Sequence, residues 1–222
     1  GKSITKSHWI RDMGRFYGRN IFLAETSSTT GGLDSLLQPT GSLKHAQEKV
    51  TRAFGSRQSF FVTNGTSTAN KIVTQALVHP YALVLAGAHP VYMDAYALDR
   101  YTIFGGVPLR EMKRHLLALK RAGKLNRVRM LLLTNSTFDG IVYDPERIMS
   151  EILAIKPDMI FLWDEAWFAF ARATPTYRRR TAMEAAKRMR ERFKDEAYRA
   201  QYSEWSAEFE RSSAADDETW LD

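Results

Sequence analysis

An acidic residue ends one of the short apolar runs of this sequence. Residues 160–167 read I-F-L-W-D-E-A-W, and Asp164 falls where a buried parallel strand would deliver its last residue. In open α/β sheets, ligands bind just beyond the carboxyl ends of the strands, so an acid at such an end is a candidate site residue. An acid there can equally cap the segment that follows, because acids are common helix starters. Asp164 alone therefore leaves both roles open.

A second short run, Gln58 to Thr63, favours a β-strand and leads into a cluster of small polar residues. The cluster contains Gly65, Thr66 and Ser67, and apolar residues at helical spacing follow it at Ile72, Val73, Ala76 and Leu77. This pattern predicts a strand-to-helix turn, where free backbone N–H groups and the helix dipole suit a phosphate. Neither the dinucleotide fingerprint nor the Walker A pattern is present, and a plain N-cap cluster is the alternative interpretation.

A third run shows the same arrangement. Residues Val128 to Leu133 are apolar apart from Arg129, and the polar residues Thr134, Asn135, Ser136 and Thr137 come next. If the three strands are parallel neighbours, their polar ends face one crevice, with a phosphate cradle on one side and a carboxylate on the other. The sequence therefore predicts an α/β fold with a ligand site at the carboxyl ends of its strands.

Three segments of the chain resemble one enzyme family. They are Phe60 to Lys71 (FFVTNGTSTANK), Leu131 to Asp144 (LLLTNSTFDGIVYD) and Phe161 to Phe170 (FLWDEAWFAF). They are similar to the large domain of the ornithine/lysine/arginine decarboxylases, which are pyridoxal-phosphate enzymes of the aspartate-aminotransferase fold. The resemblance implies a three-layer aspartate-aminotransferase-type large domain, with a mainly parallel sheet flanked by helices.

The resemblance also implies a role for each matched residue. In the family, the Gly-Thr-Ser turn holds the cofactor phosphate, which corresponds here to Gly65, Thr66 and Ser67. The strand-end acid of the family pairs with the pyridine nitrogen, which corresponds to Asp164. That pair keeps the ring nitrogen protonated, so that the ring accepts the electrons released when the substrate carboxylate leaves. Asp164 is therefore expected to be catalytic.

Two further residues would lie against or beside the cofactor ring by the same resemblance. They are Ala166 and Trp167, which follow the strand-end acid. For Trp167, packing in the hydrophobic core is an equally good interpretation of the sequence.

The chain departs from the family in two places. The family carries its Schiff-base lysine in a Ser-x-His-Lys segment, and no lysine of this sequence has that context. The family also has a strand and a cofactor-stacking histidine before the segment Tyr81 to Ala88, whereas here His79 and Pro80 run directly into Tyr81. We do not assign the stacking role to His79 or His89. The chain is expected to be an incomplete enzyme: a chain without its mobile segments, a truncated chain or a degenerate paralogue.

The composition is that of a globular cytoplasmic protein. With 222 residues and 44% hydrophobic content, the chain can bury a core, and we expect one domain over 1–222, with an N-terminal segment at 1–50 and a helical part at 180–222. The run Tyr81 to Ala88 is too short to span a bilayer. Cysteine is absent and the histidines show no ligand spacing, so no metal site is expected.

The net charge of +7 raises the question of nucleic-acid binding. Basic residues cluster at Arg110 to Arg129 and at Arg178 to Lys194, both on predicted amphipathic helices. One apolar stripe contains Leu109, Met112, Leu116 and Leu119, and the other contains Ala182, Ala185, Met189 and Phe193. We interpret the basic residues as solvated helix faces and expect neither a nucleic-acid nor a membrane partner.

Two regions of the sequence suggest that the protein forms an oligomer. The aromatic residues Tyr198, Tyr202, Trp205 and Phe209 recur at helical spacing, and such a stripe needs a partner surface. The stretch Glu25 to Gly41 is rich in Ser, Thr and Gly and predicts irregular structure. By resemblance this stretch would lie near the active site or a dimer interface, so a homodimer or higher homo-oligomer is expected.

The function predicted from these observations is pyridoxal-phosphate-dependent decarboxylation of a basic amino acid. The substrate would be lysine, ornithine or arginine, but the residues do not reveal which. An aminotransferase or another lyase of the same fold is the alternative within this chemistry, and a catalytically silent scaffold subunit is the alternative outside it. We expect the chain by itself to be inactive.

Overall fold

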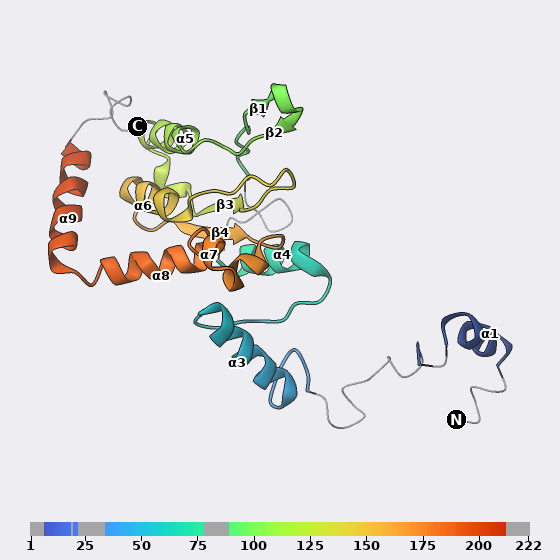
Figure 1. Cartoon of the computed structure of the whole chain (residues 1–222). Helices are drawn as coiled ribbons and strands as arrows, with labels where there is room; N and C mark the ends of the chain where they lie inside the picture. The colour runs from blue at the N-terminus through green and yellow to red at the C-terminus, as the bar shows by residue number, and fades with distance from the viewer. Residues whose placement is uncertain (1–6, 19, 22–33, 78–88, 212–222) are drawn as a thin grey trace. The chain divides into compact units, whose positions relative to one another are not determined.

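The structure is a computed structural model that describes residues 7–18, 20–21, 34–77 and 89–211. It contains two compact units, Gly1–Phe61 and Val62–Asp222 (Figure 1). The expected single domain over 1–222, with its segments 1–50 and 180–222, stays a prediction. The features predicted at His79 and at Tyr81 to Ala88, and the part of Glu25 to Gly41 before residue 34, lie outside the described residues.

Among its described residues, the first unit contains two helices, α1 (His8–Tyr17) and α3 (Ser42–Phe54). Residues 34–41 are irregular, as predicted for this stretch, and Asp34 stabilises the start of α3. Its carboxylate accepts hydrogen bonds from the backbone N–H groups of Gly41, Leu43 and Lys44, at 2.7, 2.9 and 3.2 Å. These N–H groups have no partner within the helix, so Asp34 acts as a cap from outside it.

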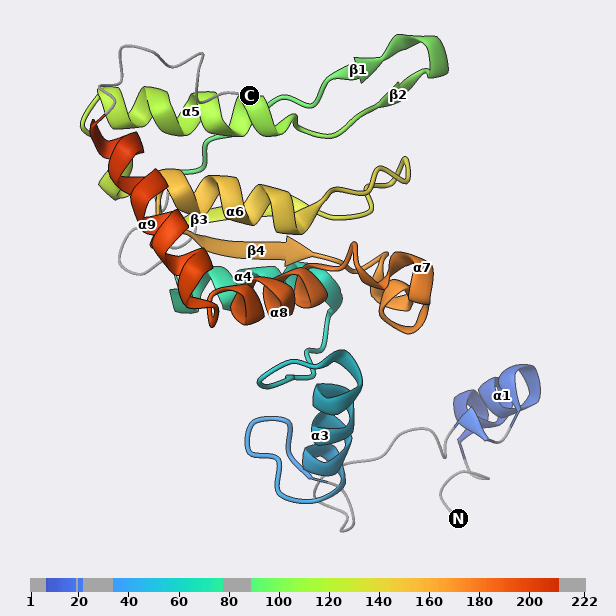
Figure 2. The same ribbon diagram turned by 60° about the vertical axis from the view of Figure 1, so that its left-hand side comes forward.

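The second unit contains most of the secondary structure (Figure 2). Its elements are α4 (Gly65–Leu77), β1 (Ala97–Leu98), η2 (Asp99–Tyr101), β2 (Ile103–Phe104), α5 (Leu109–Arg121), η3 (Leu125–Arg127), β3 (Met130–Thr134), α6 (Pro145–Ile155), β4 (Ile160–Asp164), η4 (Ala169–Ala173), α7 (Pro175–Arg178), α8 (Ala182–Arg192) and α9 (Glu196–Arg211). Strands β1 and β2 form a short antiparallel hairpin. The α/β class predicted from the sequence is confirmed.

Strands β3 and β4 form a parallel pair, which includes two of the three predicted strand ends. The register pairs Met130 with Ile160 at one end and Thr134 with Asp164 at the other. Parallel neighbours need a long crossover between them, and α6 provides it. The apolar runs predicted as strands therefore end side by side.

The hydrophobic core lies between this sheet and helices α5, α6 and α9. Its buried residues are Met112, Leu116, Leu117, Leu133, Ile148, Ile152, Ile155, Met159 and Phe209. Leu133 points into the core from β3, whereas its neighbour Leu132 is 44% exposed, as the alternation of a strand requires. Both predicted apolar stripes are confirmed in their central residues, since Met112 and Leu116 are buried on α5, and Ala185 and Met189 on α8.

The strand predicted at Gln58 to Thr63 is wrong. This segment has no strand pairing, and Phe60 and Phe61 are 70% and 37% exposed. A β-favouring sequence forms a strand only where a neighbour supplies hydrogen bonds and a surface to pack against. Within the described residues the parallel sheet has two strands, β3 and β4, and neither of them pairs with this segment.

The aromatic stripe on α9 packs against residues of the same unit. It consists of Tyr198, Tyr202, Trp205 and Phe209. Phe209 is 2% exposed within the core, and Lys120 of α5 places its Nζ 3.9 Å from the centre of the Phe209 ring. Phe193 forms edge contacts with the rings of Tyr198 and Tyr202 at centroid distances of 5.3 and 5.1 Å. The stripe was expected to need a partner surface in a further part of the same chain or in a second subunit, and for Phe209 this expectation is wrong.

Basic side chains of the predicted clusters form ion pairs. Arg188 and Arg192 of α8 both contact Glu146 of α6, with N–O distances of 2.5 and 2.6 Å. Lys120 contacts Glu210 at 3.0 Å and so joins α5 to α9. Within the described residues, no helix has the length and apolarity required to cross a bilayer, and no group of three potential metal-binding side chains occurs.

A buried ion-pair network joins α5 to α6. The Lys113 side chain is 5% exposed, and its Nζ lies 2.7 Å from Glu151 Oε2, while Arg147 Nε lies 2.6 Å from Glu151 Oε1. Burial alone would raise the pKa of Glu151, but hydrogen bonds from Arg147 and Lys113 outweigh burial and hold this pKa below its usual value. The Glu151 carboxylate therefore stabilises the folded state while it is ionised.

We expect Glu151→Gln to lower the free energy of unfolding by about 2 kcal/mol at neutral pH, because it leaves the buried Lys113 ammonium without its counter-charge. Because the pKa of Glu151 is lower in the folded state than in the unfolded state, its carboxylate stabilises the folded protein fully above the unfolded-state pKa. This contribution is lost as the pH falls through the folded-state pKa. The difference between wild type and variant should therefore shrink below about pH 4. Urea denaturation as a function of pH measures it.

Glu191→Gln is the matched control, since Glu191 pairs with Lys194 in an exposed contact whose side chains are 56% and 66% exposed. Exposed pairs contribute little, so this variant should unfold like wild type. Equal losses for the two variants, or a Glu151→Gln loss that does not change with pH, would contradict the assignment.

Candidate active site

The carboxyl ends of β3 and β4 bring two predicted clusters together. Thr134 ends β3 directly opposite Asp164 at the end of β4. The ladder continues for one more bond, because the backbone N–H of Asn135 donates to the Asp164 carbonyl oxygen at 2.9 Å. The two strand ends are thus held in register at the edge where α/β sheets bind ligands.

The side chain of Asp164 contacts helix α4. Asn70 Nδ2 of α4 donates to Asp164 Oδ2 at 3.1 Å, and the backbone N–H of Ala166 donates to Asp164 Oδ1 at 3.2 Å. The side chain is half-buried. Figure 2 shows the beginning of α4 at the same end of the unit as the tip of β4. The predicted anion turn and the predicted acid therefore belong to neighbouring elements.

The turn before α4 has the geometry of an anion cradle. Asn64 and Gly65 have φ angles of 66° and 75°, and α4 begins at Gly65. A Cβ added at Gly65 would meet no atom within 4 Å, so the space before the helix is open. The first N–H groups of a helix have no intrahelical acceptor, and these groups belong to Gly65, Thr66 and Ser67. The cradle and the nearby carboxylate fit a molecule with a phosphate and a protonated ring nitrogen.

The second acid of the Asp-Glu pair has a different environment. Glu165 Oε1 accepts hydrogen bonds from Asn135 Nδ2 at 2.7 Å and from the backbone N–H of Ala182 at 2.8 Å. Ala182 is the first residue of α8, where an acidic side chain is favoured by the helix dipole. Glu165 thus caps the start of α8, and Asp164 also fulfils the capping role considered for it, because its Oδ1 accepts a hydrogen bond from the Ala166 N–H in the turn after β4.

Asn135 is fully buried and joins four segments of the site. Its Nδ2 donates to Glu165 and also to the Arg180 carbonyl oxygen at 2.9 Å, while its Oδ1 accepts from the backbone N–H of Tyr143 at 3.1 Å. The residue is 0% exposed. A buried amide with all these bonds fixes its neighbours, because any other arrangement would leave polar groups unsatisfied.

The two residues expected beside the cofactor ring are exposed. Ala166 lies on the surface, and Trp167 is 71% exposed, so core packing is excluded as the reason for this tryptophan. Its indole ring contacts the ring of Phe138, which is 91% exposed, edge to face at a centroid distance of 6.1 Å. The loops that follow β3 and β4 therefore present an aromatic pair.

Two residues of this site had no predicted role, and a third was predicted only in part. Asn70 lies within the motif FFVTNGTSTANK, Glu165 follows the predicted strand-end acid, and Asn135 was expected at the crevice only as one of four polar residues after a strand. Glu165 directly follows the last residue of β4, so the alternation of side chains within the strand does not predict its direction. No sequence signal identifies the partners of Asn70 and Asn135, which lie 94 and 30 residues away.

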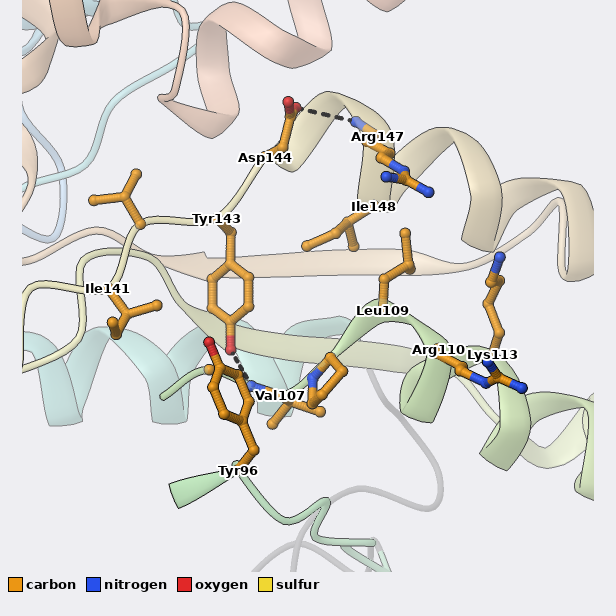
Figure 3. Close-up of a pocket in the computed structure, with 13 residues that line it drawn as sticks. Tyr96, Val107, Leu109, Arg110, Lys113, Ile141, Tyr143, Asp144, Arg147 and Ile148 are labelled. Carbon is orange, nitrogen blue, oxygen red and sulfur yellow. Dashed lines mark hydrogen bonds between the residues drawn. The ribbon is translucent and has the colours of Figure 1, made fainter. Parts of the chain in front are cut away.

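A separate pocket of about 430 Å³ lies between the start of α5 and the start of α6 (Figure 3). The Tyr143 hydroxyl accepts a hydrogen bond from the Val107 N–H at 2.7 Å, and burial raises the pKa of this hydroxyl although the bond opposes the shift. Gly106 permits this approach, because a Cβ there would lie 2.8 Å from the Tyr143 hydroxyl oxygen. None of the predicted site residues, all of which the structure describes, lines this pocket.

Three charged side chains of this pocket form ion pairs within the protein. Lys113 and Arg147 contact Glu151, and Asp144 contacts Arg180 at 3.0 Å. Figure 3 shows Lys113 and Arg147 along the wall formed by α5 and α6. These charges stabilise the packing of the two helices.

Comparison with known proteins shows which family this chain resembles. The family model described as Orn/Lys/Arg decarboxylase, major domain, matches residues 1–194. A lysine decarboxylase of Pseudomonas aeruginosa is 32% identical over 192 residues, which cover 77% of this chain and 25% of that protein. The constitutive ornithine decarboxylase of Escherichia coli is 30% identical over 184 residues, covering 72% of this chain and 25% of that protein.

An arginine-specific relative is equally similar. The biodegradative arginine decarboxylase of Escherichia coli is 30% identical over 207 residues, covering 82% of this chain and 27% of that protein. This chain thus spans about a quarter of the length of the curated relatives that it matches. No solved structure matches it significantly.

The hydrogen bonds of Asn135 generate a prediction about stability. Asn135→Ala removes bonds to Glu165, Arg180 and Tyr143 inside the protein, and we expect a loss of about 3 kcal/mol in the free energy of unfolding. The urea midpoint should fall while the denaturant slope stays constant. Asn126→Ala, at an exposed asparagine in η3, is the control and should change little. If the two variants unfold at the same urea concentration, the bonds of Asn135 do not hold the site.

Proposed function

The chain belongs to the Orn/Lys/Arg decarboxylase family, and from this membership we propose that it forms the cofactor-binding part of a pyridoxal-phosphate-dependent decarboxylase of a basic amino acid. The observation that supports this proposal most directly is the contact between Asp164 and α4. It brings a strand-end carboxylate to the helix whose first residues form an open anion cradle. The full reaction is proposed for the whole protein.

The proposal assigns each part of the site to a part of the cofactor. The backbone N–H groups and hydroxyls of Thr66 and Ser67, together with the Gly65 N–H, would hold the phosphate. The Asp164 carboxylate would face the ring nitrogen, with Ala166 and Trp167 beside the ring. Bound pyridoxal phosphate supplies the electron sink for loss of the substrate carboxylate as carbon dioxide.

The chain's own residues then have defined tasks. Asp164 keeps a proton on the ring nitrogen, because a carboxylate opposite that nitrogen favours its charged form. Glu165 and Asn135 fix the end of β4 through their hydrogen bonds, and we propose that they thereby keep Asp164 oriented toward α4. No lysine of the sequence has the family's Ser-x-His-Lys context, so this chain by itself is expected to bind cofactor without turning over substrate.

The wider organisation follows from the same proposal. We propose a three-layer aspartate-aminotransferase-type domain in the complete protein, a homodimer or higher homo-oligomer, and a place in cytoplasmic amino-acid metabolism. A catalytically silent scaffold subunit is the second candidate. Turnover of lysine, ornithine or arginine by the complete protein distinguishes the enzyme from the scaffold.

The first functional prediction concerns cofactor binding by this chain. Pyridoxal phosphate should bind and change its absorption spectrum, but borohydride should not attach it to a specific lysine. Gly65→Ala should weaken binding at least tenfold, because a side chain at φ 75° is strained and the turn would have to change its conformation. Gly123→Ala is the matched control, since Gly123 has a φ of 66° and an equally open surrounding. A borohydride adduct on one defined lysine would show that the chain does contain the nucleophile.

The second functional prediction concerns Asp164 in the complete enzyme. Asp164→Asn keeps the shape of the side chain and removes its charge, so it should retain most of the cofactor affinity and lower kcat by a factor of about 100 or more. Each factor of ten corresponds to about 1.4 kcal/mol, and a buried charge pair to the cofactor contributes several kcal/mol. Steady-state kinetics measure the change. A variant with near-normal kcat would contradict the role of Asp164.

A further inference from the structure

The Asp164 carboxylate is held at both of its oxygens. Ala166 donates to Oδ1 from the turn that follows β4, two residues along the chain. Asn70 donates to Oδ2 from α4, which is 94 residues away in the sequence. The bond from Ala166 is local to the end of β4, whereas the bond from Asn70 determines where the Asp164 carboxylate lies relative to α4.

The element that carries Asn70 also carries the anion cradle. Asn70 lies five residues after Gly65 in the same helix, and five helical residues rise about 7.5 Å. An α-helix is a rigid spacer over this length. The bond from Asn70 therefore fixes the distance between the Asp164 carboxylate and the N–H groups that begin α4.

The chemistry of an amide suits this task. A lysine or arginine at position 70 would pair with Asp164 and compete with a positively charged ligand for its charge. The neutral Asn70 amide donates a hydrogen bond and leaves the negative charge in place. Each carboxylate oxygen accepts more than one bond, so Asp164 keeps an acceptor for a second donor.

We propose that Asn70 is a positioning residue: it sets the Asp164 carboxylate at a fixed distance from the phosphate cradle, so that the phosphate and ring nitrogen of one cofactor molecule engage both at once. This inference rests on the proposed function and goes beyond it, because it adds a residue and a coupling between two subsites. The competing explanation is that Asn70 only ties α4 to the sheet.

Four variants of the complete protein separate these explanations: Asn70→Ala, Asn70→Asp, Asp164→Asn and the exchange variant Asn70→Asp/Asp164→Asn. The readouts are the Kd of pyridoxal phosphate and the urea midpoint of the cofactor-free protein. Asn70→Ala should raise Kd about tenfold, which corresponds to about 1.4 kcal/mol. Asn70→Asp should raise it further, because two carboxylates would then face each other.

The exchange variant tests the contact separately from the position of the charge. It keeps an amide and a carboxylate in contact, so the urea midpoint should return to the wild-type value. The negative charge would then lie on α4 instead of β4, so turnover, measured as a third readout, should stay at the level of Asp164→Asn. If exchange restores turnover together with stability, the position of the carboxylate does not matter, and both the role of Asp164 and the positioning role of Asn70 are wrong.

Gln75→Ala is the control for changes in α4, because Gln75 is an exposed amide on the same helix. It should leave Kd and the urea midpoint unchanged. If wild type binds pyridoxal phosphate and Asn70→Ala binds it with the same Kd, the positioning role is overturned while the proposed function stands. If wild type itself does not bind the cofactor, the proposed function is overturned as well.

Discussion

The parallel pairing of β3 with β4 is the constraint on which the rest of the site depends. In this register Thr134 lies opposite Asp164, and a shift by one residue would turn every side chain of a strand to the other face. Asp164 would then exchange places with Glu165 and lose its contact with α4. The core below the sheet maintains the register, because Leu133 is buried against α5 and α6 only in this arrangement.

The hydrogen-bond donors to the Asp164 carboxylate are neutral, so its negative charge is not paired with a cation among the described residues. Asp164 receives bonds from an amide and a backbone N–H, whereas many other acids of this unit pair with arginine or lysine. Glu165, one residue later, accepts bonds from Asn135 and from the start of α8 and serves as a structural acid. Two adjacent carboxylates thus have different tasks, because Asp164 ends β4 and contacts α4, whereas Glu165 follows the strand and contacts the start of α8.

The secondary structure could be predicted from the sequence where a local pattern of residues determines it. Apolar runs that end in polar residues gave β3 and β4 and placed Asp164 at a strand end, and apolar spacing gave α4, α5 and α8. The failures involve long-range partners. Gln58 to Thr63 has the composition of a strand but no neighbour to pair with, and Phe209 finds its partners in α5 of the same chain. Asn70 was overlooked because its importance comes entirely from a contact across 94 residues.

We propose that Asp164 faces the ring nitrogen of a cofactor anchored at α4. Nitrogen NMR of the complete protein with pyridoxal phosphate labelled with ¹⁵N in its ring tests this claim most directly. The account predicts the resonance of a protonated pyridine nitrogen throughout the neutral pH range, and its shift to that of an unprotonated nitrogen in Asp164→Asn. A ring nitrogen that is unprotonated in wild type, or that gives the same spectrum in both proteins, would contradict it.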